Sequence, residues 1–187
     1  MSHPYFSAVG IDPSLTACGV ALIQECDGEK RREVFTLGRK GKKDETLEQR
    51  HDRIMTLVSE IVELILSLDV SALVTIEGPA HGGTTGSHHD RSGLWWMIVH
   101  EVSNRTGCTI VEVTPTQLKK YATGKGNVSK SEVMAAAIRR YIDVPIANDN
   151  EADAFVLAAM GARFIGEPIE DSLPKLNLDA MTKLVRP

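Results

Sequence analysis

Residues 5–24 read YFSAVGIDPSLTACGVALIQ, and the hairpin that this stretch predicts is the base of the whole fold. Residues 5–11 are an apolar run typical of a strand, and the run ends at Asp12, which is followed by a proline. Residues 18–24 predict a second strand after a tight turn, and residues 33–37 predict a third. Because the connections are short, we expect the three strands to form an antiparallel meander.

Helix and strand patterns alternate after the meander. In residues 44–68 apolar side chains recur at helical spacing, and Thr46 with Gln49 has the form of a capping box. The later segments predict strands at 70–77 and 109–113, a mobile loop at 81–92, and helices at 93–105, 130–141 and 150–165. This order predicts an α/β fold with a five-stranded mixed sheet and helices on both faces.

The composition is that of a globular protein in a reducing environment. The chain has 187 residues, is 42% hydrophobic and contains no apolar run near the roughly 18 residues that span a membrane, so we expect no membrane contact. Its three cysteines, Cys18, Cys26 and Cys108, have no metal-site spacing and favour a cytoplasmic location. We expect residues 1–165 to form one domain and residues 166–187 to be a loosely attached C-terminal extension.

The net charge of −4 conceals two basic segments. Residues 28–43 hold seven Lys or Arg against two Glu, and residues 114–142 hold six against one, so each segment carries a net charge of +5. Solvated surface charge accounts for the first segment as well as nucleic-acid binding does. The second segment also contains a more specific arrangement of lysines and glycines, which favours contact with phosphate.

Two carboxylates follow strands that the fold is expected to bring together. Asp12 ends the first strand, although an Asp before a proline can also simply start a turn. Glu77 ends an apolar strand, where a carboxylate needs a partner or a metal ion. If these strands are parallel neighbours, both side chains emerge at the same sheet edge, which is the usual place for a site in an α/β sheet.

A third acidic group lies at the start of the last predicted helix. Asn150 and Asp153 are three residues apart and share a helix face, while Asp149 is a candidate N-cap and Glu151 points elsewhere. An acidic first turn also has an ordinary explanation, because the helix dipole favours it. Taken with the two strand-end carboxylates, this group predicts a site for hard divalent cations and metal-dependent phosphodiester chemistry.

Motifs at five places along the chain occur in a characteristic order. They are DPSLTACG at 12–19, Glu77, TPTQLK at 114–119, GKGNVSKSEV at 124–133 and NEADA at 150–154. In this order they resemble the RuvC family of Holliday-junction resolvases, which have the ribonuclease-H-like fold. The resemblance covers residues 5–161, so residues 1–165 are expected to be the nuclease domain; the small size and unusual tail suggest a phage-type member.

The resemblance implies a Mg²⁺-dependent endonuclease that cuts Holliday junctions in DNA recombination and repair. It implies two metal ions per site, with Mn²⁺ able to replace Mg²⁺. The implied metal ligands, which are also catalytic residues, are Asp12, Glu77, Asp153 and one of Asp149 and Asn150. Asn150 stands where the family usually has Asp or His, so either Asp149 or Glu151 is a candidate for a fourth carboxylate.

The resemblance also implies which basic residues meet the DNA. Lys119 and Lys130 are expected to approach the scissile phosphate and to be part of the catalytic set. Lys120 and Lys125 are expected to join them in binding branched DNA, such as a four-way junction. The family is dimeric, so a homodimer is implied.

Aromatic and histidine side chains near the second helix have several interpretations. One of Trp95 and Trp96 is expected at the dimer contact, with stacking on DNA bases as the alternative. His81, His88 and His89 are favoured as surface histidines over a transition-metal site, and contact with DNA phosphate is a third option.

Three other functions remain open at this point. The nearest is a broader flap or fork nuclease with the same fold. A non-catalytic DNA-binding scaffold is kept open by Asn150. An actin-like ATPase or sugar kinase shares an Asp-containing first hairpin, but it needs glycine-rich phosphate loops and usually a much longer chain.

Overall fold

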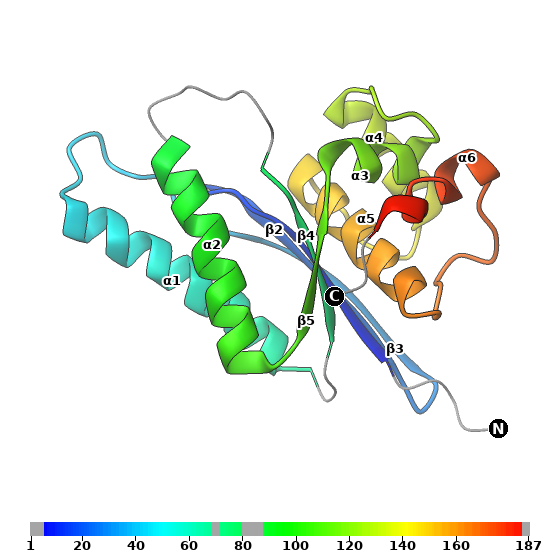
Figure 1. Cartoon of the computed structure of the whole chain (residues 1–187), viewed down its shortest axis with the longest axis horizontal. Helices are drawn as coiled ribbons and strands as arrows, with labels where there is room; N and C mark the ends of the chain where they lie inside the picture. Colours follow the sequence, from blue (N-terminus) through cyan, green and yellow to red (C-terminus); the bar gives the residue numbers. More distant parts are fainter. Residues whose placement is uncertain (1–5, 69–71, 80–87, 185–187) are drawn as a thin grey trace.

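A five-stranded mixed sheet forms the centre of the computed structural model, which describes residues 6–68, 72–79 and 88–184 (Figure 1). The strands are β1 (Phe6–Asp12), β2 (Cys18–Cys26), β3 (Glu29–Leu37), β4 (Leu73–Glu77) and β5 (Thr109–Val113). Their order is β3-β2-β1-β4-β5; β1, β2 and β3 pair antiparallel, and β4 pairs parallel with β1 and β5. The predicted meander and mixed sheet are therefore confirmed.

Helices cover both faces of this sheet (Figure 1). On one face lie α1 (Leu47–Leu66) and α2 (His88–Thr106); on the other lie α3 (Pro115–Thr123), α4 (Lys130–Arg140), α5 (Asp149–Phe164), α6 (Lys175–Leu178) and the 3₁₀ turn η1 (Met181–Lys183). The buried apolar side chains accordingly form two clusters, one on each side of the sheet. None of the described helices is long and apolar enough to cross a membrane.

Capping boxes start three of the helices. In each box a Ser or Thr side chain accepts a hydrogen bond from the backbone N–H three residues later, and that residue's side chain accepts one in return. The pairs are Thr46 with Gln49, Thr114 with Gln117 and Ser129 with Glu132. The predicted box at Thr46 is confirmed, and it makes α1 begin at Leu47 instead of residue 44. The sequence did not predict α3, because its nine residues are too short a window for a clear periodicity.

The start of α2 differs from the prediction. This helix begins at His88, so His88 and His89 are helical and do not belong to a mobile loop. The remainder of that predicted loop, with His81, lies outside the described residues. Both described histidines are exposed, as predicted.

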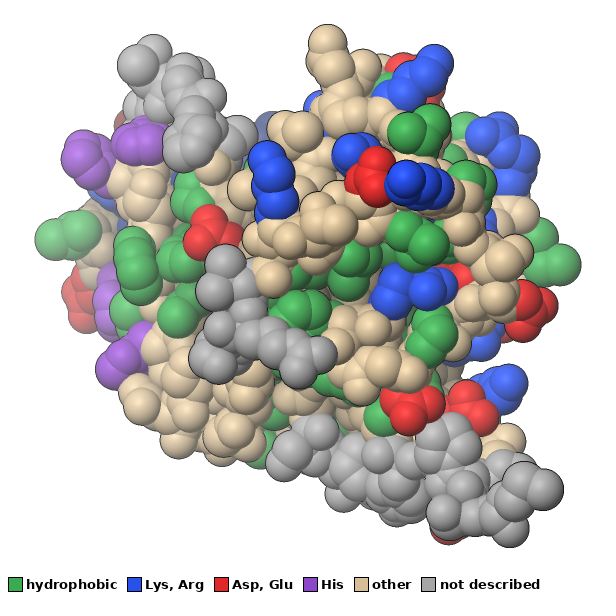
Figure 2. Space-filling model, turned by 45° about the vertical axis from the view of Figure 1, so that its right-hand side comes forward, with side chains coloured by type: hydrophobic (Ala, Val, Ile, Leu, Met, Phe, Trp, Pro, Cys, Tyr) green, Lys and Arg blue, Asp and Glu red, His purple; other side chains and the backbone are tan. Residues whose placement is uncertain are grey.

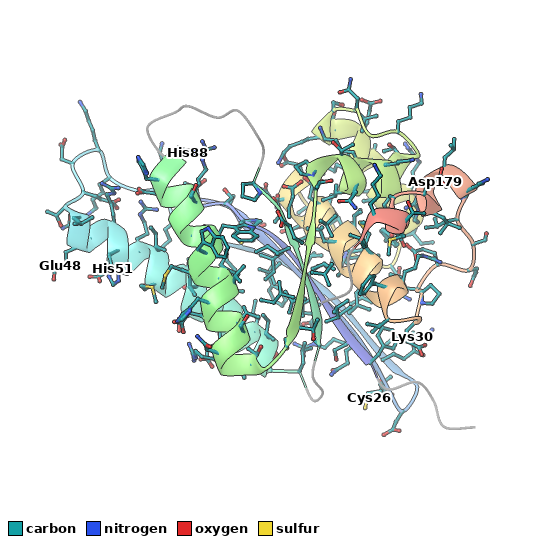
Figure 3. The ribbon with its side chains drawn as sticks, in the orientation of Figure 1. Cys26, Lys30, Glu48, His51, His88 and Asp179 are labelled. Carbon is teal, nitrogen blue, oxygen red and sulfur yellow. The ribbon has the colours of Figure 1, made fainter. Side chains whose placement is uncertain are left out.

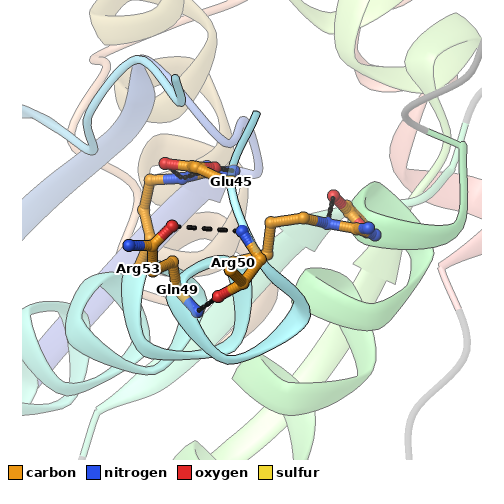
Figure 4. A network of polar contacts seen from close by, with 6 residues as sticks. Glu45, Gln49, Arg50 and Arg53 are labelled. Atoms are coloured by element: carbon orange, nitrogen blue, oxygen red, sulfur yellow. Dashed lines mark hydrogen bonds and ion pairs between the residues drawn. The ribbon is translucent and has the colours of Figure 1, made fainter. Parts of the chain in front are cut away.

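A polar network joins the first turns of α1 and α2 (Figure 4). Both carboxylate oxygens of Asp90, on α2, accept hydrogen bonds from Arg50, on α1. Arg53 adds an ion pair of 3.0 Å with Glu45, just before α1. Because Arg–carboxylate pairs with two bonds have a defined geometry, this network fixes the start of α2 relative to α1.

Two glycines let α5 lie directly on the centre of the sheet. A Cβ atom at Gly10 would lie 1.9 Å from the carbonyl oxygen of Ala154, and one at Gly19 would lie 2.1 Å from that of Asn150. Only a residue without a side chain permits so close an approach of helix and strand. The first turn of α5 is thereby placed beside the carboxyl end of β1.

The tail packs against α3, contrary to the expectation of loose attachment. Asn177 is 5% exposed, and its side-chain amide donates to the carbonyl oxygen of Tyr121 at 2.8 Å. Glu170 accepts from the hydroxyl of Tyr121 at 2.9 Å and pairs with Arg163 at 3.0 Å. The expectation is therefore wrong for residues 166–184, whereas the division of the chain into a domain and an extension stays a prediction.

Candidate active site

Asp12 and Glu77 emerge at the same edge of the sheet. β1 and β4 are parallel neighbours with Ile11 opposite Ile76, so the residues that follow lie side by side. Asp12 is only 5% exposed, and its Oδ2 atom finds no hydrogen-bond partner among the described residues. A buried carboxylate oxygen without a partner is costly unless a cation can reach it.

The first turn of α5 brings further oxygen ligands to this edge. Its N-cap is Asn148, which accepts from a backbone N–H at 3.0 Å, so the prediction of Asp149 as the cap is wrong. Asp149 is instead the first helical residue, and this register puts Asn150 on the wall of the cavity at the sheet edge. Asp153 follows one turn later and is 4% exposed.

Lys130 pairs with two of these carboxylates. It is the first residue of α4, and its Nζ atom lies 3.4 Å from Asp149 Oδ2 and 3.7 Å from Asp153 Oδ2. Burial works against its charge, but the attraction of Asp12, Asp153 and Asp149 prevails and raises the pKa of Lys130. The ammonium group therefore lies against the acidic side chains, while the Lys130 side chain stays 56% exposed.

The site is a cavity of about 370 Å³ with an acidic floor. One wall comes from α2, whose His88, Arg91, Ser92 and Trp95 all line it. Trp95 also donates from Nε1 to the carbonyl oxygen of Glu77 at 2.9 Å, which ties this wall to the end of β4. Arg91 and Ser92 were not predicted from the sequence, although their spacing of three and four residues from His88 places them on one helix face.

Burial and mutual repulsion disfavour the ionised forms of the three carboxyl groups. Burial, followed by the charge of Asp12, raises the pKa of Glu77 to about 9 and that of Asp153 to about 7. Burial also raises the pKa of Asp12, against the attraction of Lys130. A divalent cation among these groups would favour their ionised forms, since an opposite charge lowers a carboxyl pKa.

The donor set fits a hard cation, although its side chains do not yet surround one. Within the described residues, no three His, Cys, Asp or Glu side chains are already arranged to hold a metal ion. Asp12 Oδ2, which has no hydrogen-bond partner in the described part of the chain, and the other carboxylate oxygens are nevertheless the ligands that Mg²⁺ and Mn²⁺ prefer. These side chains would have to reorient to surround such an ion.

The other predicted DNA-binding lysines lie apart from this cavity. Lys119 is partly exposed on α3, and Lys120 pairs with Asp179 at 3.7 Å. Lys125 lines a separate groove between α4 and the tail. Figure 2 shows Lys and Arg side chains spread, among some acidic ones, over the face that α3 and α4 form. Among the described residues, Lys130 lines the cavity, whereas Lys119, Lys120 and Lys125 do not.

Comparison with known proteins places this site in a family. The sequence model of crossover junction endodeoxyribonuclease RuvC matches residues 8–160. The protein of that name from Chlamydia trachomatis serovar L2 is 31% identical over 156 residues, which cover 80% of this chain and 87% of that protein. The one from Pseudarthrobacter chlorophenolicus is 28% identical over 153 residues, covering 80% and 76%.

A solved structure shows the same fold. T. thermophilus RuvC, in complex with a Holliday junction substrate, matches with a TM-score of 0.65 and 13% identity, covering 87% of this chain and 98% of that chain. This likeness confirms the predicted ribonuclease-H-like fold. Because the family model also spans most of the sequence, the chain belongs to the RuvC family of crossover junction endodeoxyribonucleases.

Proposed function

We propose that this protein is a Holliday-junction-resolving endonuclease that hydrolyses phosphodiester bonds with bound divalent metal. Its family consists of crossover junction endodeoxyribonucleases, and these nucleases are metal-dependent. The observation that carries the proposal is the Oδ2 atom of Asp12, which is buried among the carboxyl groups at the sheet edge and has no hydrogen-bond partner among the described residues. Such an arrangement is unfavourable by itself and suits a cation bound for catalysis.

We assign the metal site to Asp12, Glu77, Asp153 and Asn150, with Asp149 assisting. Two Mg²⁺ ions bound there would supply an activated water and stabilise charge on the leaving 3′ oxygen. Mn²⁺ is expected to substitute, because it also accepts carboxylate and carbonyl oxygens. Lys130, whose Nζ atom lies 3.4 Å from Asp149 and 3.7 Å from Asp153, is placed to offset phosphate charge at this site.

We propose branched DNA as the substrate and a homodimer as the active form. The related T. thermophilus protein was solved with a Holliday junction, which supports junction binding here. A two-fold dimer would present two such sites to two strands of one junction. Trp96, 65% exposed on α2, is the tryptophan that we propose for the dimer contact. The cytoplasmic location and the phage-type origin stay predictions.

The test of this function is cleavage of a synthetic four-way junction, compared with a fork and a linear duplex of the same sequence. Metal-dependent cutting of the junction at paired sites, with 5′ phosphate products, is the expected result. Equal rates on junction and fork would favour the broader flap or fork nuclease. Binding without cleavage in Mg²⁺ and in Mn²⁺ would favour a DNA-binding scaffold and overturn the proposal.

The lysines of the second basic segment should differ in their effects. We expect Lys130→Ala and Lys119→Ala each to reduce the slope of log affinity against log salt by about one unit, since each removes one phosphate contact. Lys130→Ala should also slow cleavage more, because Lys130 lines the cavity and Lys119 does not. The measurements are junction affinity against salt concentration and single-turnover cleavage rates.

A suitable control for both lysine variants is Lys30→Ala. Lys30 lies at the far end of the β2–β3 hairpin (Figure 3), and its side chain is 58% exposed. This variant should keep the parent's salt slope and rate. Unchanged slopes and rates in the Lys119 and Lys130 variants as well would assign both lysines to ordinary surface.

The fourth metal ligand can be identified by comparing three positions on α5. We expect Asn150→Asp to retain activity with an altered preference between Mg²⁺ and Mn²⁺, because Asn150 lines the cavity and a carboxylate can replace its amide oxygen. Asp149→Ala should be milder than Asp153→Ala, because Asp149 is the more exposed partner of Lys130. Cleavage rates against Mg²⁺ and Mn²⁺ concentration decide this. If Asp149→Ala is as inactive as Asp153→Ala while Asn150→Ala still cuts, Asp149 is the ligand.

A further inference from the structure

A hydrogen-bonded clamp joins the start of α5 to the edge strand β3. The Thr36 hydroxyl, on β3, donates to Glu151 Oε1 at 2.8 Å. The same hydroxyl accepts from the side-chain amide of Asn148 at 2.9 Å. Thr36 is separated from these two residues by more than one hundred positions in the sequence, so the clamp is a product of the tertiary fold.

Glu151 is fully engaged in this clamp and faces away from the cavity. Glu151 is 8% exposed, and its second carboxylate oxygen, Oε2, accepts a hydrogen bond from the backbone N–H of Ala147 at 2.7 Å. Its own N–H donates to Oδ1 of Asn148 at 3.0 Å. With both oxygens occupied on this side of the helix, Glu151 is not placed to serve as the fourth metal ligand that the sequence left open.

The clamp lies beside the point where α5 crosses the sheet. Thr36 is the cross-strand partner of Gly19 in the β2–β3 pairing. The backbone of Asn150 passes over Gly19, where a Cβ atom would lie 2.1 Å from the carbonyl oxygen of Asn150. The glycine therefore sets the distance between the helix and the sheet, while the clamp restrains rotation of the first turn about the helix axis.

We infer that Glu151, held by Thr36, is a positioning residue for the metal site. It fixes the rotation of the first turn of α5, so that Asn150 and Asp153 point toward Asp12 and Glu77. Glu151 thereby acts on the ligands through the helix that it shares with them. This inference rests on the proposed function of the same site, and its test is chosen to be separate from the cleavage test.

The test is Thr36→Val, which replaces the hydroxyl by a methyl group. The position is exposed and lies in a strand, where valine is well tolerated. The loss leaves Glu151 Oε1 and the Asn148 amide without their shared partner. We expect the dissociation constant for Mn²⁺ to rise about tenfold, a typical result of removing a group that orients metal ligands. It is measured on the DNA-free protein by electron paramagnetic resonance of unbound Mn²⁺, and checked by the Mg²⁺ concentration that gives half-maximal cleavage.

A matched control makes the same chemical change away from the site. Thr46→Val removes a hydroxyl that caps α1, at a cost of about 1 kcal/mol of stability. A purely structural loss of this size should leave the Mn²⁺ dissociation constant unchanged. The control therefore separates a general loss of stability from misplacement of the metal ligands.

Glu151→Met provides a second variant, and Glu151→Gln is its conservative counterpart. A glutamine can restore both contacts, because its Oε1 accepts from Ala147 while its amide nitrogen donates to Thr36, so Glu151→Gln should bind Mn²⁺ more tightly than Glu151→Met, which has no oxygen to accept from Thr36 or Ala147. Glu151→Met should bind Mn²⁺ more weakly than the Thr46→Val control, and with Thr36→Val it forms the pair of clamp variants. If both clamp variants bind Mn²⁺ as tightly as Thr46→Val, the positioning role is overturned. That result would leave the proposed function intact, because junction cleavage by the parent protein is established by its own experiment.

Discussion

Asp12→Asn is expected to abolish junction cleavage while leaving junction binding largely intact. The carboxylate ends β1 at the centre of the acidic floor, and its loss should remove the best-placed metal ligand. We expect the single-turnover rate to fall by about a thousandfold or more, which corresponds to about 4 kcal/mol of transition-state stabilisation. Binding should persist in EDTA because the affinity for DNA rests mainly on basic residues.

The stability of this variant gives an independent check on the site. Burial raises the pKa of Asp12, so its ionised form destabilises the folded protein at any pH above the ordinary value near 4. An asparagine has no such cost, and the metal-free variant should melt at the parent's temperature or above it at pH 8. Asp52→Asn is the control, because Asp52 is 70% exposed on α1. Full cleavage by a folded Asp12→Asn protein would remove Asp12 from the metal site.

Gly10→Ala is expected to have the largest effect on folding. The new methyl group would lie 1.9 Å from the carbonyl oxygen of Ala154 and 2.4 Å from the backbone nitrogen of Ala158, so α5 would have to move off the sheet. Both atoms belong to the backbone of α5, so neither can rotate away as the end of a side chain can. We expect a loss of about 4 kcal/mol or more, or failure to fold, measured by urea unfolding followed by circular dichroism.

Gly93→Ala is the matched control for this substitution. A Cβ atom at Gly93, on the exposed side of α2, would meet no described atom within 4 Å. Alanine in an exposed helical position should stabilise the protein by about 0.5 to 1 kcal/mol. A Gly10→Ala protein as stable as the parent would show that α5 does not lie this close to β1, and the support of the metal site would need another explanation.

Local signals in the sequence were sufficient for most of the fold and for the centre of the site. Short connections determine the meander of β1, β2 and β3, and the apolar runs that end at Asp12 and Glu77 place both carboxylates at strand ends. The capping box at Thr46 is equally local, since all its partners lie within one turn. The N-cap of α5 was harder to predict from local signals. Two adjacent residues, Asn148 and Asp149, are equally good N-cap residues, so the sequence does not decide which of them begins the helix.

By itself, the sequence determined the meander of β1, β2 and β3, the principal helices and the motifs that identify the family, but it left open whether β1 and β4 are parallel neighbours. Only the tertiary structure decided that His88 and Arg91 line the same cavity as Lys130, that the tail packs on α3, and that Glu151 turns toward Thr36. Periodicity and capping report which face of an element is apolar and where the element begins. They do not report which distant element meets that face, because this depends on packing between segments far apart in the chain, such as the passage of α5 over Gly10 and Gly19.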